Sequence, residues 1–210
     1  MILRKPAETS EPVHELIRER WSPRAFLDRP VPPELLTSLF EAARWAPSCN
    51  NSQPWRYIVA ASDDREAYET AQSCVNERNQ RWTRLAPVLS FVCAYRFLAD
   101  GRPSPSHMYD TGMASAQLIL QAAEHGLVVH QLAGILRDKI RETYGVPDDT
   151  DIICGLALGY QGHASLLPAE LPEREVQPRK RQALADFVFA GKFGDPYLPV
   201  TGRTTSEDIS

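Results

Sequence analysis

The 210-residue sequence lacks the marks of several classes of protein. Its four cysteines are dispersed, with no CxxC pair and no CxxH spacing, which argues against a metal site and favours reduced thiols in a cytoplasmic protein. Its most apolar stretch, Ala86 to Tyr95, is far shorter than the roughly 20 residues that a membrane-spanning helix needs. The first residues soon turn polar, so no secretory signal is predicted.

An excess of positive charge is also missing. Lys and Arg number 23 against 27 Asp and Glu, a formal net charge of −4, so a nucleic-acid partner is not expected. Neither GxGxxG nor the P-loop pattern occurs, which removes support for a Rossmann dinucleotide site or a nucleotide-binding P-loop. Ser106 and His107 are neighbours without a nucleophile elbow, so no nucleophilic triad is predicted.

The composition that is present, 43% hydrophobic and 24% charged, is that of a globular protein, and the length suits one domain. Proline outnumbers glycine, 17 to 11, which predicts many extended connections and fixed turns. Prolines recur after Gln161 together with the basic run Arg179 to Arg181. This pattern predicts an extended arm that wraps over another surface.

The hydrophobic periodicity predicts strands alternating with helices, which implies a three-layer mixed α/β or α+β domain. A first helix is expected to begin at a Ser10 cap and to end near Trp21, before Pro23. The other predicted helices cover 33–46, 63–81, 110–125 and 135–144, and the predicted strands cover 55–61, 87–95 and 151–160.

Four polar clusters could form a site. The run from Arg20 to Arg24 offers two guanidinium groups and a hydroxyl, which suit a phosphate, although a solvated helix end would look the same. The run from Ala46 to Trp55 offers amides and hydroxyls that could read a planar heterocycle or simply cap a turn. The run from His130 to Ile135 contains a glycine that lets the backbone approach a ligand, as it would in an ordinary turn.

The fourth cluster, Arg179 to Arg181, could be a solvated run of charge. Together the four clusters are rich in Arg, Asn, Gln and Ser but hold no nucleophile and no metal ligands. Such a site is typical of a protein that binds an organic cofactor with its own reactivity.

The four clusters lie within a longer series of segments. Between residues 13 and 196 these segments follow one another in the order RERWSPRAF, EAARWAPSCNNSQPWRYIV, an NxxW motif, YDTGMASAQLILQAAEHGL, HQLAGI, LALGY and PRKRQALADFVFAGKFG. In this order and spacing the sequence resembles the FMN-dependent nitroreductase family. The resemblance implies an α+β, three-layer α-β-α fold with a mixed, largely antiparallel central sheet and an extended C-terminal arm. It also implies a homodimer with the flavin site at the subunit interface.

The resemblance matches a set of cofactor-binding positions: Arg20, Trp21, Ser22, Arg24, Pro47, Ser48, Asn51, Asn79, Gln131, Leu132, Ala133, Gly134, Arg179 and Arg181. It assigns the residues at 20, 22 and 24 to the phosphate, ribityl and pyrimidine side of FMN, and the arm's two arginines to the phosphate. Asn79 matches an asparagine at the pyrimidine edge, and the run from Gln131 to Gly134 matches a turn against the ring. The residues at 47, 48 and 51 match a segment supplied by the second subunit.

The implied function is an FMN oxidoreductase that passes hydride from NADH or NADPH to nitroaromatic, quinone or related acceptors by a ping-pong mechanism. The flavin carries the chemistry, so no catalytic side chain is predicted. A specialised relative, such as a reductive dehalogenase or a flavin-cleaving or dehydrogenating enzyme, is an alternative. A non-enzymatic flavin-binding protein is another.

The resemblance implies that the chain consists of an N-terminal extension (1–12), one FMN-binding domain (13–196) that includes the wrapping arm (161–196), and a tail (197–210) expected to be mobile. Two positions depart from the pattern of some relatives. Ala133 stands where they have an acidic residue, and Trp82 where they have a basic one. The loop from Arg96 to Tyr109 matches nothing that assigns it a role.

Overall fold

The computed structural model describes residues 2–197 of the chain, so all of the predicted tail except Tyr197 lies outside the described residues. The strands are β1 (Trp55–Ala61), β2 (Val88–Tyr95), β3 (Val128–Leu132) and β4 (Thr150–Gly159). The helices are α1 (Glu15–Glu19), α2 (Pro33–Arg44), α3 (Arg65–Ser73), α4 (Glu77–Thr83), α5 (His107–Glu124), α6 (Arg137–Tyr144) and α7 (Leu171–Val176).

The four strands form one sheet in the order β1-β2-β4-β3, and each of these pairings is antiparallel. The inner strand β2 is mostly apolar and buried along nearly its whole length, because helices cover both faces of the sheet. Side chains of β2 alternate between two cores: Leu89 and Phe91 point to one, and Val88 and Val92 to the other. The predicted α+β class is confirmed.

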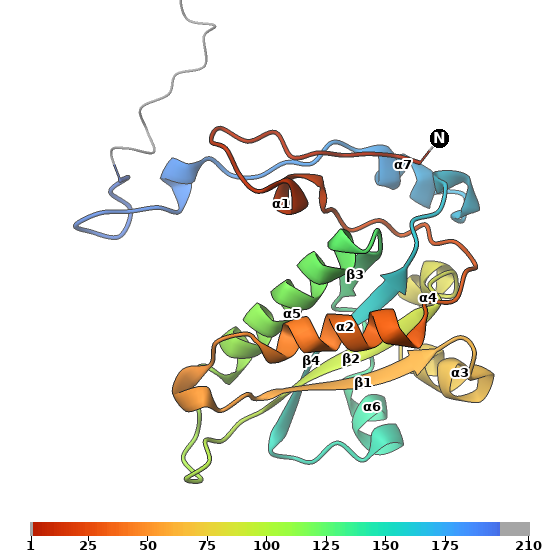
Figure 1. The fold of residues 1–210 in the computed structure, drawn as a ribbon, viewed down its shortest axis with the longest axis horizontal. Coiled ribbons are helices and arrows are strands. Elements are labelled where there is room, and N and C mark those ends of the chain that lie inside the picture. Colours follow the sequence, from red (N-terminus) through yellow and green to blue (C-terminus); the bar gives the residue numbers. More distant parts are fainter. Residues whose placement is uncertain (1, 198–210) are drawn as a thin grey trace, which may run out of the picture.

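The two cores make the fold a three-layer structure (Figure 1). On one face of the sheet, α2 and α5 pack together through Leu39, Ala43 and Leu118. On the other face, α3 and α6 contribute Ala71 and Ile140. Each helix thus buries one apolar stripe, as its sequence periodicity predicts.

Two predicted helices differ from the observed ones. The helix expected over 63–81 is two helices, because Val75 leaves α3 to pair with Ile135 and Asn76 then caps α4 by accepting the N–H of Asn79. The first helix begins at Glu15 rather than after Ser10. Pro12 disfavours helical geometry at the residue before it, which removes the first turn that a Ser10 cap would need.

The arm and the N-terminal extension lie side by side across the end of α5 and β3 (Figure 1). Lys5 Nζ donates to the carbonyl of Glu175 at 2.9 Å, and Arg179 donates to the carbonyls of Lys5 and Arg18 at 2.9 Å each. The extension is therefore part of the layer that holds the arm. Within residues 2–197, no helix is both long and apolar enough to cross a membrane.

Candidate functional site

The segment after α1 presents polar and apolar side chains in alternation. Trp21 and Pro23 are buried, whereas Arg20, Ser22 and Arg24 are partly exposed. The segment is fixed because its continuation, residues 25–27, runs along the end of β4: the N–H of residue 27 donates to the carbonyl of residue 160 at 2.9 Å, and that of residue 162 to the carbonyl of residue 25 at 2.8 Å. The three polar side chains therefore project from a rigid base.

His130 of β3 braces the same segment from inside. Its Nδ1 lies 2.9 Å from the carbonyl oxygen of Ser22 and 3.1 Å from that of Pro23, and since carbonyls only accept, Nδ1–H donates to both. Burial, with a further effect of the Arg24 guanidinium, lowers the pKa of His130 to about 4. The ring is therefore neutral at neutral pH and acts as a support rather than as a charge.

Three guanidinium groups gather beside this segment. Burial lowers the pKa of Arg20, and the nearby charges of Arg179 and Arg181 lower it further. Over residues 2–197 none of the three forms an ion pair with a carboxylate. Ser22 adds its hydroxyl, to which Arg20 Nη1 donates at 3.2 Å. Guanidinium groups without an ion-pair partner, next to a hydroxyl, suit a phosphate group.

A cavity of about 250 Å³ lies further along the same segment. Its lining comes from four parts of the chain: Arg24, Asn76, Arg78, Asn79, Trp82, Gly134, Leu171 and Arg174. Burial is the main cause that lowers the pKa of the Arg24 guanidinium, and the charges of the two other lining arginines lower it further. The cavity is thus positive and lined with amides, which suits the polar edge of a planar, electron-accepting ring.

Trp82 fixes the orientation of one of these amides. It is 2% exposed, and its Nε1–H donates to Asn79 Oδ1 at 3.1 Å, which leaves Asn79 Nδ2 to face the carbonyl of Gly134 at 3.4 Å. The indole packs against the His130 ring, with centroids 4.6 Å apart, and below the Arg24 guanidinium at 6.0 Å. In this chain the aromatic residue therefore orients Asn79.

Gly134 lets the turn after β3 touch α4. A Cβ atom at this position would lie 2.1 Å from Asn79 Nδ2 and 2.5 Å from Asn76 Nδ2. The Gly134 carbonyl also accepts the backbone N–H of Asn76 at 3.0 Å. Of the neighbouring predicted residues, Leu132 is buried in the core, while Gln131 and Ala133 are exposed. The turn is therefore built for close contact with α4 rather than being a simple connection.

The remaining predicted residues, Pro47, Ser48 and Asn51, lie elsewhere. They precede β1, whereas α3 and α4 lie beyond the other end of that strand (Figure 1). Within one chain they are therefore not brought to the cavity, and their place opposite a second subunit stays a prediction. Their loop is held in an unusual conformation, with φ of 50° at residue 50, 53° at residue 51 and 47° at Gln53.

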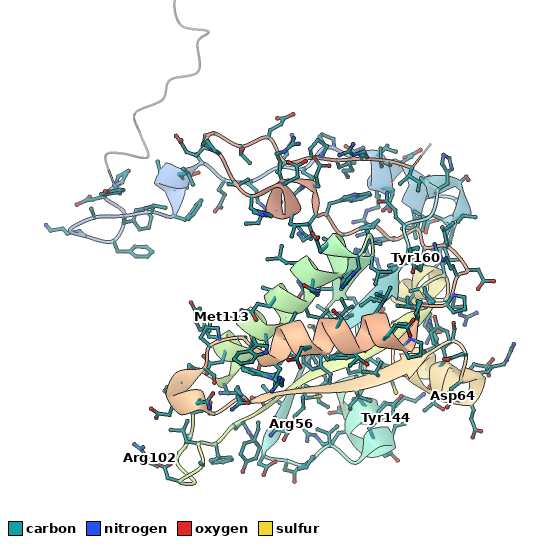
Figure 2. The ribbon with its side chains drawn as sticks, viewed as in Figure 1. Arg56, Asp64, Arg102, Met113, Tyr144 and Tyr160 are labelled. Atoms are coloured by element: carbon teal, nitrogen blue, oxygen red, sulfur yellow. The ribbon has the colours of Figure 1, made fainter. Side chains whose placement is uncertain are left out.

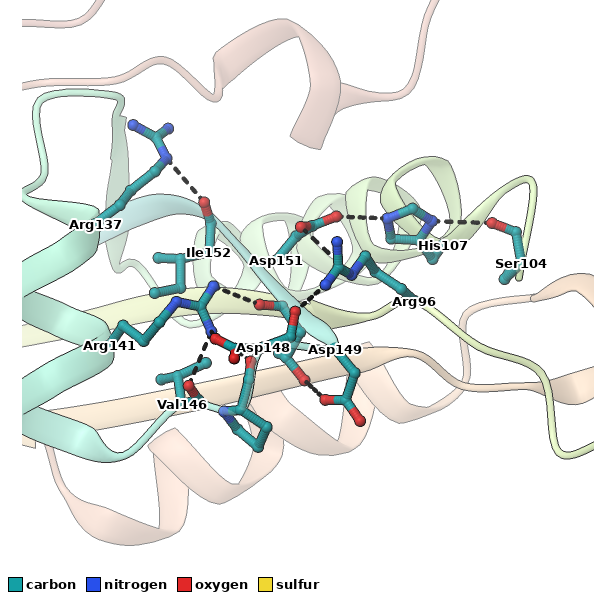
Figure 3. A network of polar contacts seen from close by, with 12 residues as sticks. Arg96, Ser104, His107, Arg137, Arg141, Val146, Asp148, Asp149, Asp151 and Ile152 are labelled. Atoms are coloured by element: carbon teal, nitrogen blue, oxygen red, sulfur yellow. Dashed lines mark hydrogen bonds and ion pairs between the residues drawn. The ribbon is translucent and has the colours of Figure 1, made fainter. Parts of the chain in front are cut away.

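A separate polar network joins the 96–106 loop to β4 (Figure 3). His107 Nε2 lies 2.8 Å from Asp151 Oδ2, and its Nδ1 lies 3.0 Å from the carbonyl of Ser104. The Ser106 hydroxyl donates instead to Asp110. His107 thus has a carboxylate partner that the sequence does not reveal, but no hydroxyl to activate. The network ties the loop down and is not a nucleophilic triad.

Sequence analysis does not predict four further residues of the site: Lys5, Arg78, Arg174 and Glu175. Lys, Arg and Glu are common on protein surfaces, so these four positions do not stand out in the sequence. Only folding brings the N-terminus and the arm to the segment after α1. Arg78 is the exception, because it directly precedes Asn79 of the NxxW motif in α4, and this neighbour could have suggested its place at the site.

The chain matches the model of the nitroreductase family over residues 17–160. The solved structure of an oxidoreductase containing FMN is 40% identical and superposes with a TM-score of 0.85, covering 90% of this chain and 96% of that one. A Stenotrophomonas maltophilia protein, provisionally named NADH dehydrogenase/NAD(P)H nitroreductase, is 27% identical over 73% of this chain and 87% of its own. The chloronitrobenzene nitroreductase of Comamonas testosteroni is 43% identical, over only 30% of this chain and 28% of its own.

Proposed function

The chain belongs to the nitroreductase family of oxidoreductases, and from this premise we propose that it binds FMN and uses NADH or NADPH to reduce nitroaromatic, quinone or related acceptors. The names of the relatives support three parts of this proposal: FMN in one, NAD(P)H in another and a nitroaromatic substrate in a third. The quinone acceptors rest on the family resemblance alone. We also propose that the protein is located in the cytoplasm.

The observation that carries the proposal is the pairing of two different positive sites on one rigid segment. Arg20, with the arm's two arginines, offers a cluster of positive charge for a phosphate. Arg24 opens onto the cavity that holds Asn79 and the Gly134 turn. A ligand that joins a phosphate to a planar ring with polar edges would satisfy both, and FMN has this chemistry.

Within this proposal the residues bind, orient and balance charge. Bound FMN supplies hydride transfer, first from the nicotinamide and then to the acceptor, in a ping-pong cycle. Asn79, held by Trp82, presents its amide to the ring edge. Arg24 and Arg78 would place positive charge beside the bound ring, and this would favour its reduced state.

We also propose that two copies of the chain form the site. A groove of about 560 Å³ between the N-terminal layer and α5 is lined largely by apolar side chains, among them Leu16, Trp21, Ile119 and Leu127. Tyr160, labelled in Figure 2, also lines it. The arm carries exposed aromatic residues as well. A second copy seated there would cover these surfaces and could bring its own residues 47–51 to the cavity.

The absorption spectrum of the purified protein, followed by titration with FMN and anaerobic stopped-flow reduction, tests the proposal. We expect a flavin spectrum, FMN binding in the micromolar range or tighter, and rapid bleaching by NADH, NADPH or both. Nitroaromatics and quinones should then restore the oxidised spectrum. A protein that stays colourless with added FMN would overturn the proposal, and slow bleaching by both nicotinamides would favour a flavin-binding protein without this activity.

A further inference from the structure

Glu175 is a carboxylate of the arm that lies directly behind the segment after α1. Its side chain is 2% exposed, and Oε1 accepts the backbone N–H of Arg24 at 2.7 Å and that of Ala25 at 3.3 Å. One residue of α7 thus fixes the backbone of a segment 150 positions away. Lys5 holds the carbonyl of the same residue from the other side.

The second oxygen of this carboxylate is not satisfied in the same way. Oε2 is buried and has no hydrogen-bond partner over residues 2–197, and its nearest cation is Arg24 Nη1 at 3.6 Å. A buried charge with a free oxygen is costly, so a purely structural role would be filled as well by a neutral amide. The negative charge itself therefore calls for an explanation.

The surroundings supply one. Arg24 stands between Glu175 on one side and the cavity on the other, and the cavity also holds Arg78 and Arg174. Without Glu175 none of the three arginines that line the cavity would have an ion-pair partner within residues 2–197. Glu175 is thus the negative charge closest to the group that meets the proposed ligand.

We propose that Glu175 is a positioning residue with an electrostatic role: through Oε1 it fixes the backbone of Arg24, and through its charge it moderates the positive cavity and so lowers the reduction potential of the bound flavin. This inference rests on the proposed FMN function. The two roles belong to different properties of the side chain, so two substitutions can separate them.

The first test is Glu175→Gln, which keeps an oxygen to accept the two N–H groups but removes the charge. FMN affinity should stay within about threefold of wild type, because the backbone contacts remain. The affinity for reduced relative to oxidised FMN should rise about tenfold, which for a two-electron couple is a positive shift of about 30 mV. Potentiometric titration of the FMN-loaded protein measures the shift.

The second test is Glu175→Ala, which removes the acceptor as well. Leaving the N–H groups of Arg24 and Ala25 buried without a partner should raise the FMN dissociation constant about tenfold or more. Glu173→Gln is the matched control, because it removes a charge from an exposed position of the same helix. It should change neither quantity.

The outcomes separate this inference from the function on which it rests. A wild-type protein that binds no FMN overturns both. A wild-type protein that binds FMN, with Glu175→Gln matching Glu173→Gln in potential, overturns the electrostatic role of Glu175 alone. Equal FMN affinity of the Gln and Ala variants would overturn its positioning role.

Discussion

Gly134 has no side chain, and this allows the turn after β3 to contact α4 closely. We expect Gly134→Ala to push the amides of Asn79 and Asn76 out of place, because the added Cβ would lie 2.1 and 2.5 Å from their Nδ2 atoms. FMN affinity measured by flavin fluorescence should fall about tenfold through the loss of one oriented amide. Gly112→Ala is the control: nothing lies within 4 Å of the added Cβ in α5, so affinity should not change.

His130 should make stability depend on pH. Its pKa is lowered to about 4 in the folded protein, whereas the unfolded chain titrates near the ordinary value of 6.5. Between these values the unfolded state binds more protons, so the free energy of unfolding should be highest above pH 6.5 and fall as the pH drops toward 4. The loss from this one ring is up to about 3 kcal/mol.

Denaturant unfolding at pH 7 and pH 5 measures this change. His130→Asn has no titrating ring, so its difference between the two pH values should be smaller than that of the wild type. An equal difference would show that other groups account for the pH dependence. His163→Asn, at an exposed position, serves as the control.

At the scale of elements, the loop before β1 is held by a buried side chain of α5. Asp110 is 3% exposed, and its Oδ2 accepts the N–H of Cys49 and the hydroxyl of Ser106, each at 3.0 Å. Left-handed backbone at non-glycine residues costs on the order of 1 kcal/mol each, so the loop needs such an anchor. Asp110→Ala should therefore release it.

Hydrogen exchange measured on peptides that cover residues 46–54 is the direct readout. We expect faster exchange there in Asp110→Ala, together with a loss of about 1–3 kcal/mol in the free energy of unfolding. Asp110→Asn keeps an acceptor for the Cys49 N–H and should lie close to the wild type. Unchanged exchange in the Ala variant would mean that the loop holds its own conformation.

The elements also show how far the sequence predicts the fold. Strands such as β2 and helices such as α5 follow from local apolar patterns, which their own residues determine. The break between α3 and α4 depends partly on the Asn76 cap, a local signal, and partly on the pairing of Val75 with Ile135, which is distant in the sequence. The pairing of Val75 with Ile135 cannot be predicted from the local sequence, whereas the Asn76 cap can.

The residues of the site also fall into two groups, those that the local sequence predicts and those that it does not. Arg24, Asn79 and Gly134 were predicted from motif and resemblance, and the structure brings them to one cavity. That they hold FMN stays a prediction. Glu175 was not predicted, because a buried carboxylate in a proline-rich arm has no local pattern and its partner is 151 residues away.

For the whole molecule, the proposed dimer makes a prediction about complementation. Each site would take Arg24 from one chain and residues 47–51 from the other, so a defect in either half inactivates both sites of a homodimer. We expect Arg24→Ala to lose FMN by removing a cation from the cavity. Pro47→Trp should block the partner's site with bulk, since this side chain is exposed and no backbone hydrogen bond is lost.

When the two variants are mixed and exchange subunits, half of the dimers should be mixed, and each of these should have one intact site. The mixture should therefore regain about a quarter of the wild-type FMN capacity, although each variant alone binds little. Mixing Arg24→Ala with Gly134→Ala is the control, because both defects lie in the same half of the site and no exchange can restore it. No recovery in the test mixture would show that one chain holds the whole site, and the arm would then need another partner for its exposed aromatic residues. Recovery in the control would show instead that Arg24 and Gly134 reach one site from different chains.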